Sequence, residues 1–291
     1  MTHRRRGTTL VELIISLAMT GVVLALASAV LLRQHRVVSD LAGRADLAAR
    51  LRDGAGPLLA QLRTLSPADL RDTRDTALEV RATIASAVVC DTIATALVLA
   101  PAEQEQRFAA VAAPIVAGDS VWALDAGTGD WRPLRILSVG TRIPGTCAAL
   151  GPRLAGAALS SPRITISVMP PLGPLIGVPV RVTRPVRYSV YRAGDGAWYL
   201  GEKDWNNQAG RFDGVQPIAG PYLAPADGGV AFRYRDSLDR PLTDPVDRNA
   251  VRLLRVELRG RTRDVARALT TGPDARPRDS VLFAIALRNR P

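Results

Sequence analysis

Histidine, cysteine and lysine are scarce in this sequence of 291 residues. Its two histidines are His3 and His35, and its two cysteines are Cys90 and Cys147. A zinc site takes about four ligands, usually Cys or His, and a Ser-His-Asp or Cys-His centre needs a histidine beside its nucleophile. The chain past His35 has no histidine, so we expect neither site there. Paired carboxylates could still serve as acid and base, but none stands at a recognisable spacing, and we expect no enzyme and no cofactor.

The two cysteines leave two alternatives. If the domain lies outside the cytoplasm, Cys90 and Cys147 can form a disulfide, which typically contributes ~2–4 kcal/mol to stability. Otherwise they are two unrelated buried thiols.

Aromatic residues make up only 4% of the sequence, so Val, Leu, Ile and Ala must supply most of the core. Alternating Val and Ile favour β-strands. The net charge of +11 comes from arginine, because Lys203 is the only lysine. The arginines are scattered, with no basic block beyond residues 4–6, and this pattern predicts a solvated surface rather than a nucleic-acid partner.

One hydrophobic run stands near the N-terminus, from Thr8 to Leu32, and its only charged residue is Glu12. As a helix this run measures ~37 Å, enough to cross a bilayer core. The arginines before it predict a cytoplasmic N-terminus and a translocated remainder. A carboxylate at hydrocarbon depth costs on the order of 2.5–3.5 kcal/mol, so Glu12 needs a partner or a task.

Three interpretations of this run compete. An ordinary signal anchor explains the hydrophobicity but not Glu12. A secretory signal peptide cut near Ala27 or Ala29 would release an exported soluble hydrolase or binding protein, and it also leaves Glu12 unexplained. In the third interpretation the chain is cut after Gly7, so that Thr8 becomes the N-terminus and Glu12 the fifth residue of the mature chain.

The stretch RRRGTTLVELIISLAMTGVVLALA resembles the N-terminal cleavage and methylation segment of type IV pilins and type II secretion pseudopilins. That segment has a basic leader ending in glycine, then an apolar residue, Thr-Leu-(Ile/Val)-Glu and a long apolar run. Gly7 matches the glycine, and residues 9–12 match the core. Thr8 departs from the pattern, which puts its N-methylation in question. The resemblance implies cleavage by a prepilin peptidase and a Glu12 that faces the N-terminal amine of a neighbouring subunit in the filament.

The rest of the chain predicts an α+β fold. Apolar residues spaced three and four apart continue a helix over 33–65, and Gly54-Ala-Gly-Pro57 should kink or interrupt it. From residue 66 the pattern becomes β-rich, with hairpins between 121–124 and 131–139 and around Gly194-Asp195-Gly196. Further strands are expected over 77–89, 96–99 and 163–168 and in GVAFRYRD, AVRLLRVELRGRT and SVLFAIALRNR.

The C-terminal half is similar, in the order of its strand motifs, to the larger minor pilins of the W type and to pseudopilin J. Residues 102–177 have no counterpart in that resemblance. It implies a cytoplasmic leader (1–7), a single transmembrane helix in the inner membrane (8–32), an exoplasmic continuation (33–65) and a periplasmic β-rich domain (66–291). The expected role is structural, as a minor subunit at the initiating tip of a pilus or secretion pseudopilus. The motifs do not distinguish a pilus, a secretion system and a DNA-uptake system.

Four carboxylates crowd one loop, Asp236, Asp239, Asp244 and Asp247. Some members of this superfamily bind calcium through loop carboxylates. The loop lacks the glycine and the terminal glutamate of an EF-hand, and three arginines interleave with the acids. An ion-paired, solvated loop is therefore the main prediction, with calcium as the alternative.

Overall fold

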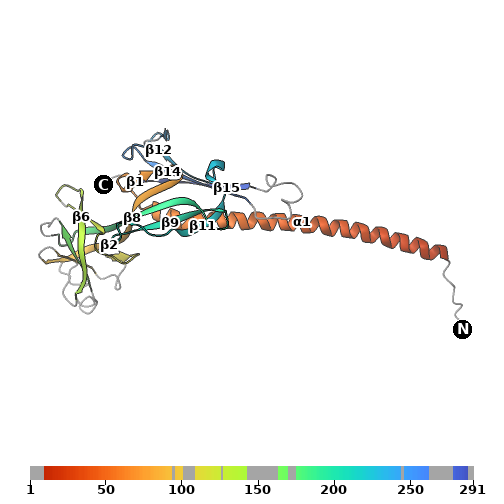
Figure 1. Cartoon of the computed structure of the whole chain (residues 1–291), viewed down its shortest axis with the longest axis horizontal. Coiled ribbons are helices and arrows are strands. Elements are labelled where there is room, and N and C mark those ends of the chain that lie inside the picture. Colours follow the sequence, from red (N-terminus) through yellow and green to blue (C-terminus); the bar gives the residue numbers. More distant parts are fainter. Residues whose placement is uncertain are drawn as a thin grey trace. The chain divides into compact units, whose positions relative to one another are not determined.

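The computed structural model describes residues 10–93, 96–100, 109–125, 127–142, 163–169, 175–243, 246–261 and 278–287. They form one long N-terminal helix followed by a mostly antiparallel β domain (Figure 1), so the predicted α+β class is confirmed. The chain divides into two compact units, Met1–Ala49 with Arg261–Asp279, and Arg50–Gly260 with Ser280–Pro291.

Helix α1 spans Leu10–Leu62, with Pro57 inside it. Of the kink or interruption predicted at residues 54–57, the interruption is wrong, and the helix ends three residues before the predicted 65. Pro57 removes one backbone hydrogen bond, to the carbonyl of Asp53. Both residues are exposed, so water can take that bond, while Leu51 and Leu58 on the other face are 1% exposed. Burial of the apolar face therefore keeps the helix continuous.

After the short 3-10 turn η1 (Pro67–Asp69), eleven strands form the larger sheet. Its longest strands, β2 and β8, pair antiparallel from Ala77↔Ser189 to Val88↔Pro179. The strands are β1 (Leu70–Thr73), β2 (Ala77–Ile93), β3 (Ala96–Leu99), β4 (Ala109–Val111), β5 (Ser120–Leu124), β6 (Trp131–Arg142), β7 (Arg163–Met169), β8 (Pro179–Arg192), β9 (Trp198–Asn206), β10 (Arg211–Phe212) and β11 (Gln216–Tyr222).

Part of this sheet closes on itself. Strand β2 pairs with β3, β3 with β7, β7 with β6, β6 with β5, β5 with β8, and β8 returns to β2. Six strands therefore make a small barrel, whose interior is filled by apolar side chains such as Val89, Ile136, Ile166 and Val182. Much of the barrel comes from residues 102–177, the segment without a counterpart in the resemblance.

The other end of the β2–β8 ribbon continues as an open sheet, where β1 pairs with β2, and β9 and then β11 follow β8. A second sheet has the order β13-β12-β14-β15. Its strands are β12 (Val230–Arg235), β13 (Pro241–Leu242), β14 (Leu253–Arg261) and β15 (Arg278–Ala286), and the 3-10 turn η3 (Pro225–Asp227) precedes them. Every predicted strand and hairpin is present.

Candidate assembly helix and its attachment

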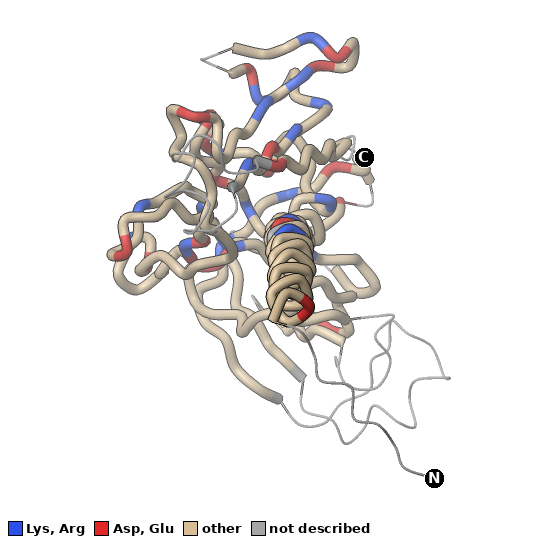
Figure 2. Tube along the Cα trace, turned by 90° about the vertical axis from the view of Figure 1, so that its right-hand side faces the viewer, with Lys and Arg blue, Asp and Glu red and all other residues tan. Residues whose placement is uncertain are grey.

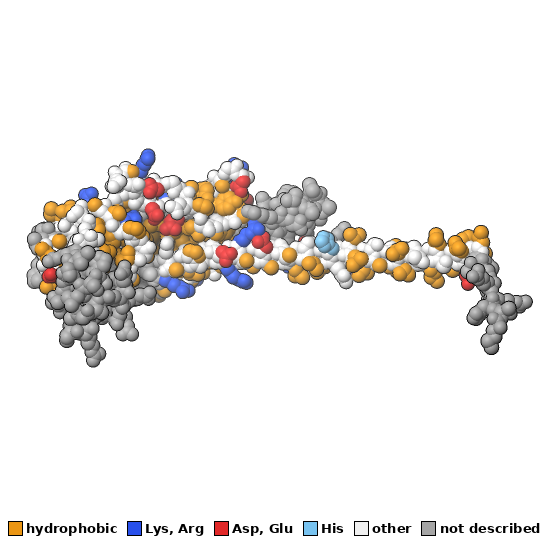
Figure 3. All heavy atoms as spheres, turned by 90° about the horizontal axis from the view of Figure 1, so that it is seen from below, with side chains coloured by type: hydrophobic (Ala, Val, Ile, Leu, Met, Phe, Trp, Pro, Cys, Tyr) orange, Lys and Arg blue, Asp and Glu red, His pale blue; other side chains and the backbone are white. Residues whose placement is uncertain are grey.

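The first part of α1 exposes its apolar side chains. From Leu10 to Leu32 every large one is 54–77% exposed, and Figure 3 shows hydrophobic atoms along this segment. The helix contains a stretch long and apolar enough to cross a membrane, and 0% of that stretch is buried within the chain. A core helix would be buried, whereas this segment has the length, composition and exposure of a membrane anchor or a signal sequence.

The few polar groups in this segment suit an apolar surrounding. Ser16 Oγ donates to the Leu13 carbonyl at 3.0 Å, and Thr20 Oγ1 donates to the Ser16 carbonyl at 2.7 Å. Neither hydroxyl proton therefore needs water. A Cβ added at Gly21 would meet nothing within 4 Å, so the helix surface is open there.

Of the residues predicted to guide processing and assembly, only Glu12 is described. It lies near the start of α1 and is exposed. Gly7 and Thr8 lie outside the described residues. The cleavage site, the methylation of Thr8 and the pairing of Glu12 with an amine all stay predictions.

The last turns of α1 pack directly on the β domain. A Cβ added at Gly54 would overlap the hydroxyl of Tyr222 and would lie 2.7 Å from Cβ of Ala219, both in β11. Burial raises the pKa of Tyr222 to about 12. Glycine at position 54 thus permits a backbone approach that any other residue would block.

A carboxylate of β9 also lies beside this helix end. Burial, and secondly the charge of Asp204, raise the pKa of Glu202, while a hydrogen bond with Gln61 of α1 acts in the opposite direction. The protonated form of Glu202 is therefore favoured relative to a free glutamate.

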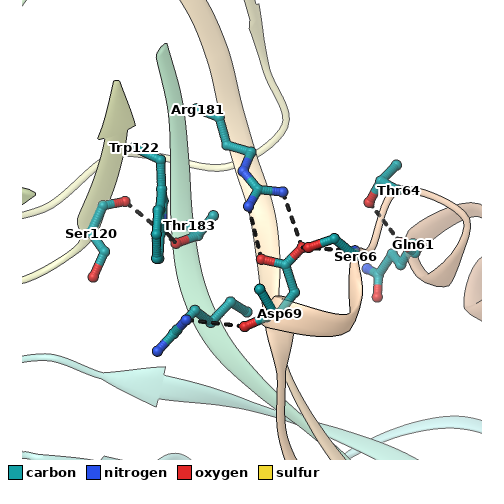
Figure 4. Close-up of polar contacts among 10 residues, drawn as sticks. Gln61, Thr64, Ser66, Asp69, Ser120, Trp122, Arg181 and Thr183 are labelled. Atoms are coloured by element: carbon teal, nitrogen blue, oxygen red, sulfur yellow. Dashed lines mark hydrogen bonds and ion pairs between the residues drawn. The ribbon is translucent and has the colours of Figure 1, made fainter. Parts of the chain in front are cut away.

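The turn after α1 is held to the sheet by a buried carboxylate, drawn in Figure 4. Asp69 is 1% exposed and accepts two bonds from Arg181 of β8, to Oδ2 at 3.1 Å and to Oδ1 at 2.9 Å. The backbone N–H and the hydroxyl of Ser66 also donate to Oδ2, at 2.9 and 2.8 Å. Because both oxygens are occupied, the charge is compensated and the turn is fixed.

Cation–aromatic contacts surround this pair. The guanidinium carbons of Arg81 and Arg181 lie 5.3 and 5.9 Å from the ring centroid of Trp122, and Trp122 Nε1 donates to Thr183 Oγ1 at 3.1 Å. Arg81 also donates to the Ala68 carbonyl at 3.2 Å. These contacts tie the turn to β2, β5 and β8, so the end of the helix is anchored on the strands where barrel and open sheet meet.

A second buried carboxylate is also fully engaged. Asp119 accepts from Nε and Nη2 of Arg184, both at 2.8 Å, from Nδ2 of Asn207 at 2.7 Å and from the backbone of Val116 at 2.9 Å. The hydrogen bond to Asp119 raises the pKa of Arg184. The two carboxylate oxygens of Asp119 have no acceptor position left for a substrate. The pair of Asp119 and Arg184 therefore stabilises the fold.

In the predicted carboxylate loop, Asp236 and Asp239 are ion-paired. Asp236 binds the guanidinium of Arg240, with Nε at 2.7 Å, and backbone hydrogen bonds, led by that of Arg240, lower the pKa of Asp236. Asp239 accepts from an arginine of β14 at 2.8 Å, and Asp247 from a backbone amide at 3.0 Å. Asp244 lies outside the described residues. Within the described ranges no group of three or more His, Cys, Asp or Glu could hold a metal ion.

The cysteines are described only in part. Cys90 is fully buried in the barrel core. Cys147 lies outside the described residues, so the pairing of these two cysteines stays a prediction.

Charges of both signs are intermixed over the β domain (Figure 2), and arginines of the second sheet have carboxylate partners, as in Arg233 with Asp75. No family model, no curated protein and no solved structure matches the chain. Fold and site together define an α+β protein whose N-terminal helix is long and apolar enough to cross a membrane and whose helix end is fixed to a β domain.

Proposed function

We propose that the chain is a structural minor subunit of a type IV pilus or type II secretion pseudopilus. The observation that carries this proposal is the apolar surface of α1, which is exposed from Leu10 onward and overlaps the motif of Gly7, Thr8 and Glu12. An exposed apolar helix needs lipid or other helices around it, and a pilin-like subunit uses both in turn.

In the proposed mechanism the chain enters the inner membrane with its N-terminus in the cytoplasm and its β domain in the periplasm. A prepilin peptidase cuts after Gly7. The new amine at Thr8 lies one helical turn from Glu12, at the spacing at which side chains meet. In the assembly Glu12 pairs with the amine of a neighbouring subunit, which compensates two charges that lipid or packed helices would otherwise leave costly.

The rival function is an exported soluble hydrolase or binding protein, released by a cut near Ala27 or Ala29. The continuity of α1 favours the anchored subunit. The helix runs unbroken past both alanines to Leu62, and its end is packed on β11 and held through the Asp69 turn. A cut near Ala29 would sever a helix whose remaining part is built into the fold.

The two functions differ in the mature N-terminus. We expect N-terminal sequencing of the protein, co-produced with a prepilin peptidase, to begin at Thr8. Substitution Gly7→Leu should leave the full chain uncut, and the matched control Gly21→Leu should not. A mature chain that begins at Ser28 or Val30 would overturn the proposal.

Assembly has its own test. The Glu12→Ala variant should insert into the membrane normally but should not co-purify with the other subunits, whereas Ser16→Ala, in the same segment, should behave as the parent. Normal co-purification of Glu12→Ala would remove the role assigned to this carboxylate.

A further inference from the structure

The exposed apolar residues of α1 form a seven-residue repeat that continues past the membrane-length segment. Leucine occupies every seventh position from 10 to 31, and Val38 and Ala45 continue the series. The repeat thus spans five heptads. The corresponding d positions are Leu13, Thr20, Ala27, Gln34 and Leu41.

Beyond Leu32 this seam lies on the exposed side of the helix. Val38 and Leu41 are 63% and 60% exposed, and Ala45 is exposed as well. At 100° per residue the opposite side of the helix carries Gly43, half-buried, and Leu47, 4% exposed. Val38 lies ~9 Å past Leu32 along the axis, so lipid does not account for its exposure.

The charges of this region lie off the seam. The a, d and e positions between residues 10 and 49 carry no Asp, Glu, Lys or Arg. At the g positions the one charged residue is Arg44, which in a parallel pair of identical helices faces Ala49 of the other copy rather than its Arg44. A second copy therefore meets this surface without juxtaposed like charges.

Resting on the proposed function, we propose that α1 pairs in parallel and in register with α1 of a second copy of this chain, through Leu31, Gln34, Val38 and Leu41. Both copies enter the same membrane in the same direction, which sets a parallel orientation and a common depth. Gln34 stands at a d position, and in an in-register pair the two Gln34 amides lie opposite each other and hydrogen-bond, which an apolar partner helix would not satisfy. The pair is thus self-complementary, as a two-fold interface requires.

Cysteine cross-linking in membranes tests this pairing with the full chain. We expect Val38→Cys to give a disulfide-linked dimer of twice the chain mass under mild oxidation, and the exposed neighbour Ser39→Cys, at a b position, to give none. Gln34→Arg in the Val38→Cys background should abolish the dimer, and Gln34→Asn should retain it. Carbonate extraction shows whether each variant is inserted.

Absence of the dimer in inserted Val38→Cys, a Ser39→Cys dimer of equal yield, or a cross-link to a chain of another mass would each overturn the pairing with a second copy. N-terminal sequencing of the same samples separates the two proposals. A Thr8 N-terminus without the dimer leaves the proposed function standing, whereas a dimer of chains cut near Ala29 or left uncut overturns the proposed function and keeps the helix pairing.

Discussion

The buried pair of Asp69 and Arg181 should be a major contributor to the stability of the β domain. Replacing Asp69 by Asn keeps the shape of the side chain but removes the charge and one acceptor, and leaves Arg181 without its counterion. Removing one partner of a buried ion pair typically costs ~3–5 kcal/mol. Arg181 is 21% exposed and lies beside Trp122, which partly compensates its charge, so we expect about 3 kcal/mol.

This loss should be visible in thermal unfolding. For a domain of this size each kcal/mol shifts the melting temperature by ~2–4 °C, which gives a decrease of ~6–12 °C for Asp69→Asn. The measurement is near-UV circular dichroism of the full chain in detergent micelles. The matched control is Asp75→Asn, whose carboxylate is 68% exposed and lies 2.8 Å from Arg233, and it should cost less than ~1 kcal/mol.

A double variant separates the loss of attraction from the stranded charge. Replacing Arg181 by Met in the Asp69→Asn background removes the uncompensated guanidinium, so part of the lost stability should return. A melting temperature of Asp69→Asn equal to that of Asp75→Asn would refute the reasoning, and so would a double variant that loses the sum of both single effects.

Three further perturbations test the packing, the titration and the cross-link. Gly54→Ala should destabilise by ~1–3 kcal/mol because its Cβ overlaps β11, whereas Gly56→Ala, which meets nothing within 4 Å, should gain up to ~1 kcal/mol of helix propensity in the same unfolding assay. Because the pKa of Glu202 is raised, the folded state binds the Glu202 proton more tightly than the unfolded state does, and ionised Glu202 destabilises the fold as the pH rises above 4.5. In urea unfolding, Glu202→Gln should therefore be more stable than the parent at pH ~7 and equally stable below pH ~4. If Cys90 and Cys147 are joined, reductant should lower stability by ~2–5 kcal/mol and change the mobility on a non-reducing gel, and an unchanged melting temperature would contradict the pairing.

The spacing of residues in the sequence was enough to predict the helix and the strands whose side chains are buried at a regular period. The spacing of apolar residues predicted α1 and the strands of both hairpins, because those side chains face one core at period 3.6 or 2. The first half of β8 was not predicted, since Pro179 and Pro185 argue against a central strand. Pro185 lies opposite Arg81 of β2. On the edge of β8 away from β2, pairing with β5 ends at Thr183 and pairing with β9 starts at Val186, so Pro185 interrupts no ladder there.

The polar attachment of the helix end could not be read from spacing, because its two partners are 112 residues apart. The local signal was present in Ser66-Pro-Ala-Asp69, the pattern of a serine followed three residues later by an acid that caps a helical turn. That pattern predicts the Ser66–Asp69 bond but not the arginine that lies across the sheet. A buried carboxylate needs a cation, yet any of many arginines in this sequence would satisfy the rule.

The closed barrel bears on how such a chain can associate. Strands in an open sheet offer unpaired N–H and C=O groups to other chains, and closure removes those edges from the six barrel strands. The open part of the larger sheet ends on β11, whose Pro217 and Pro221 each lack the N–H that an added strand would require. Strand addition is thus disfavoured at these edges, while α1 exposes an uncharged seam of five heptads. Of the barrel, β11 and α1, it is α1 that leaves a surface open to a second copy.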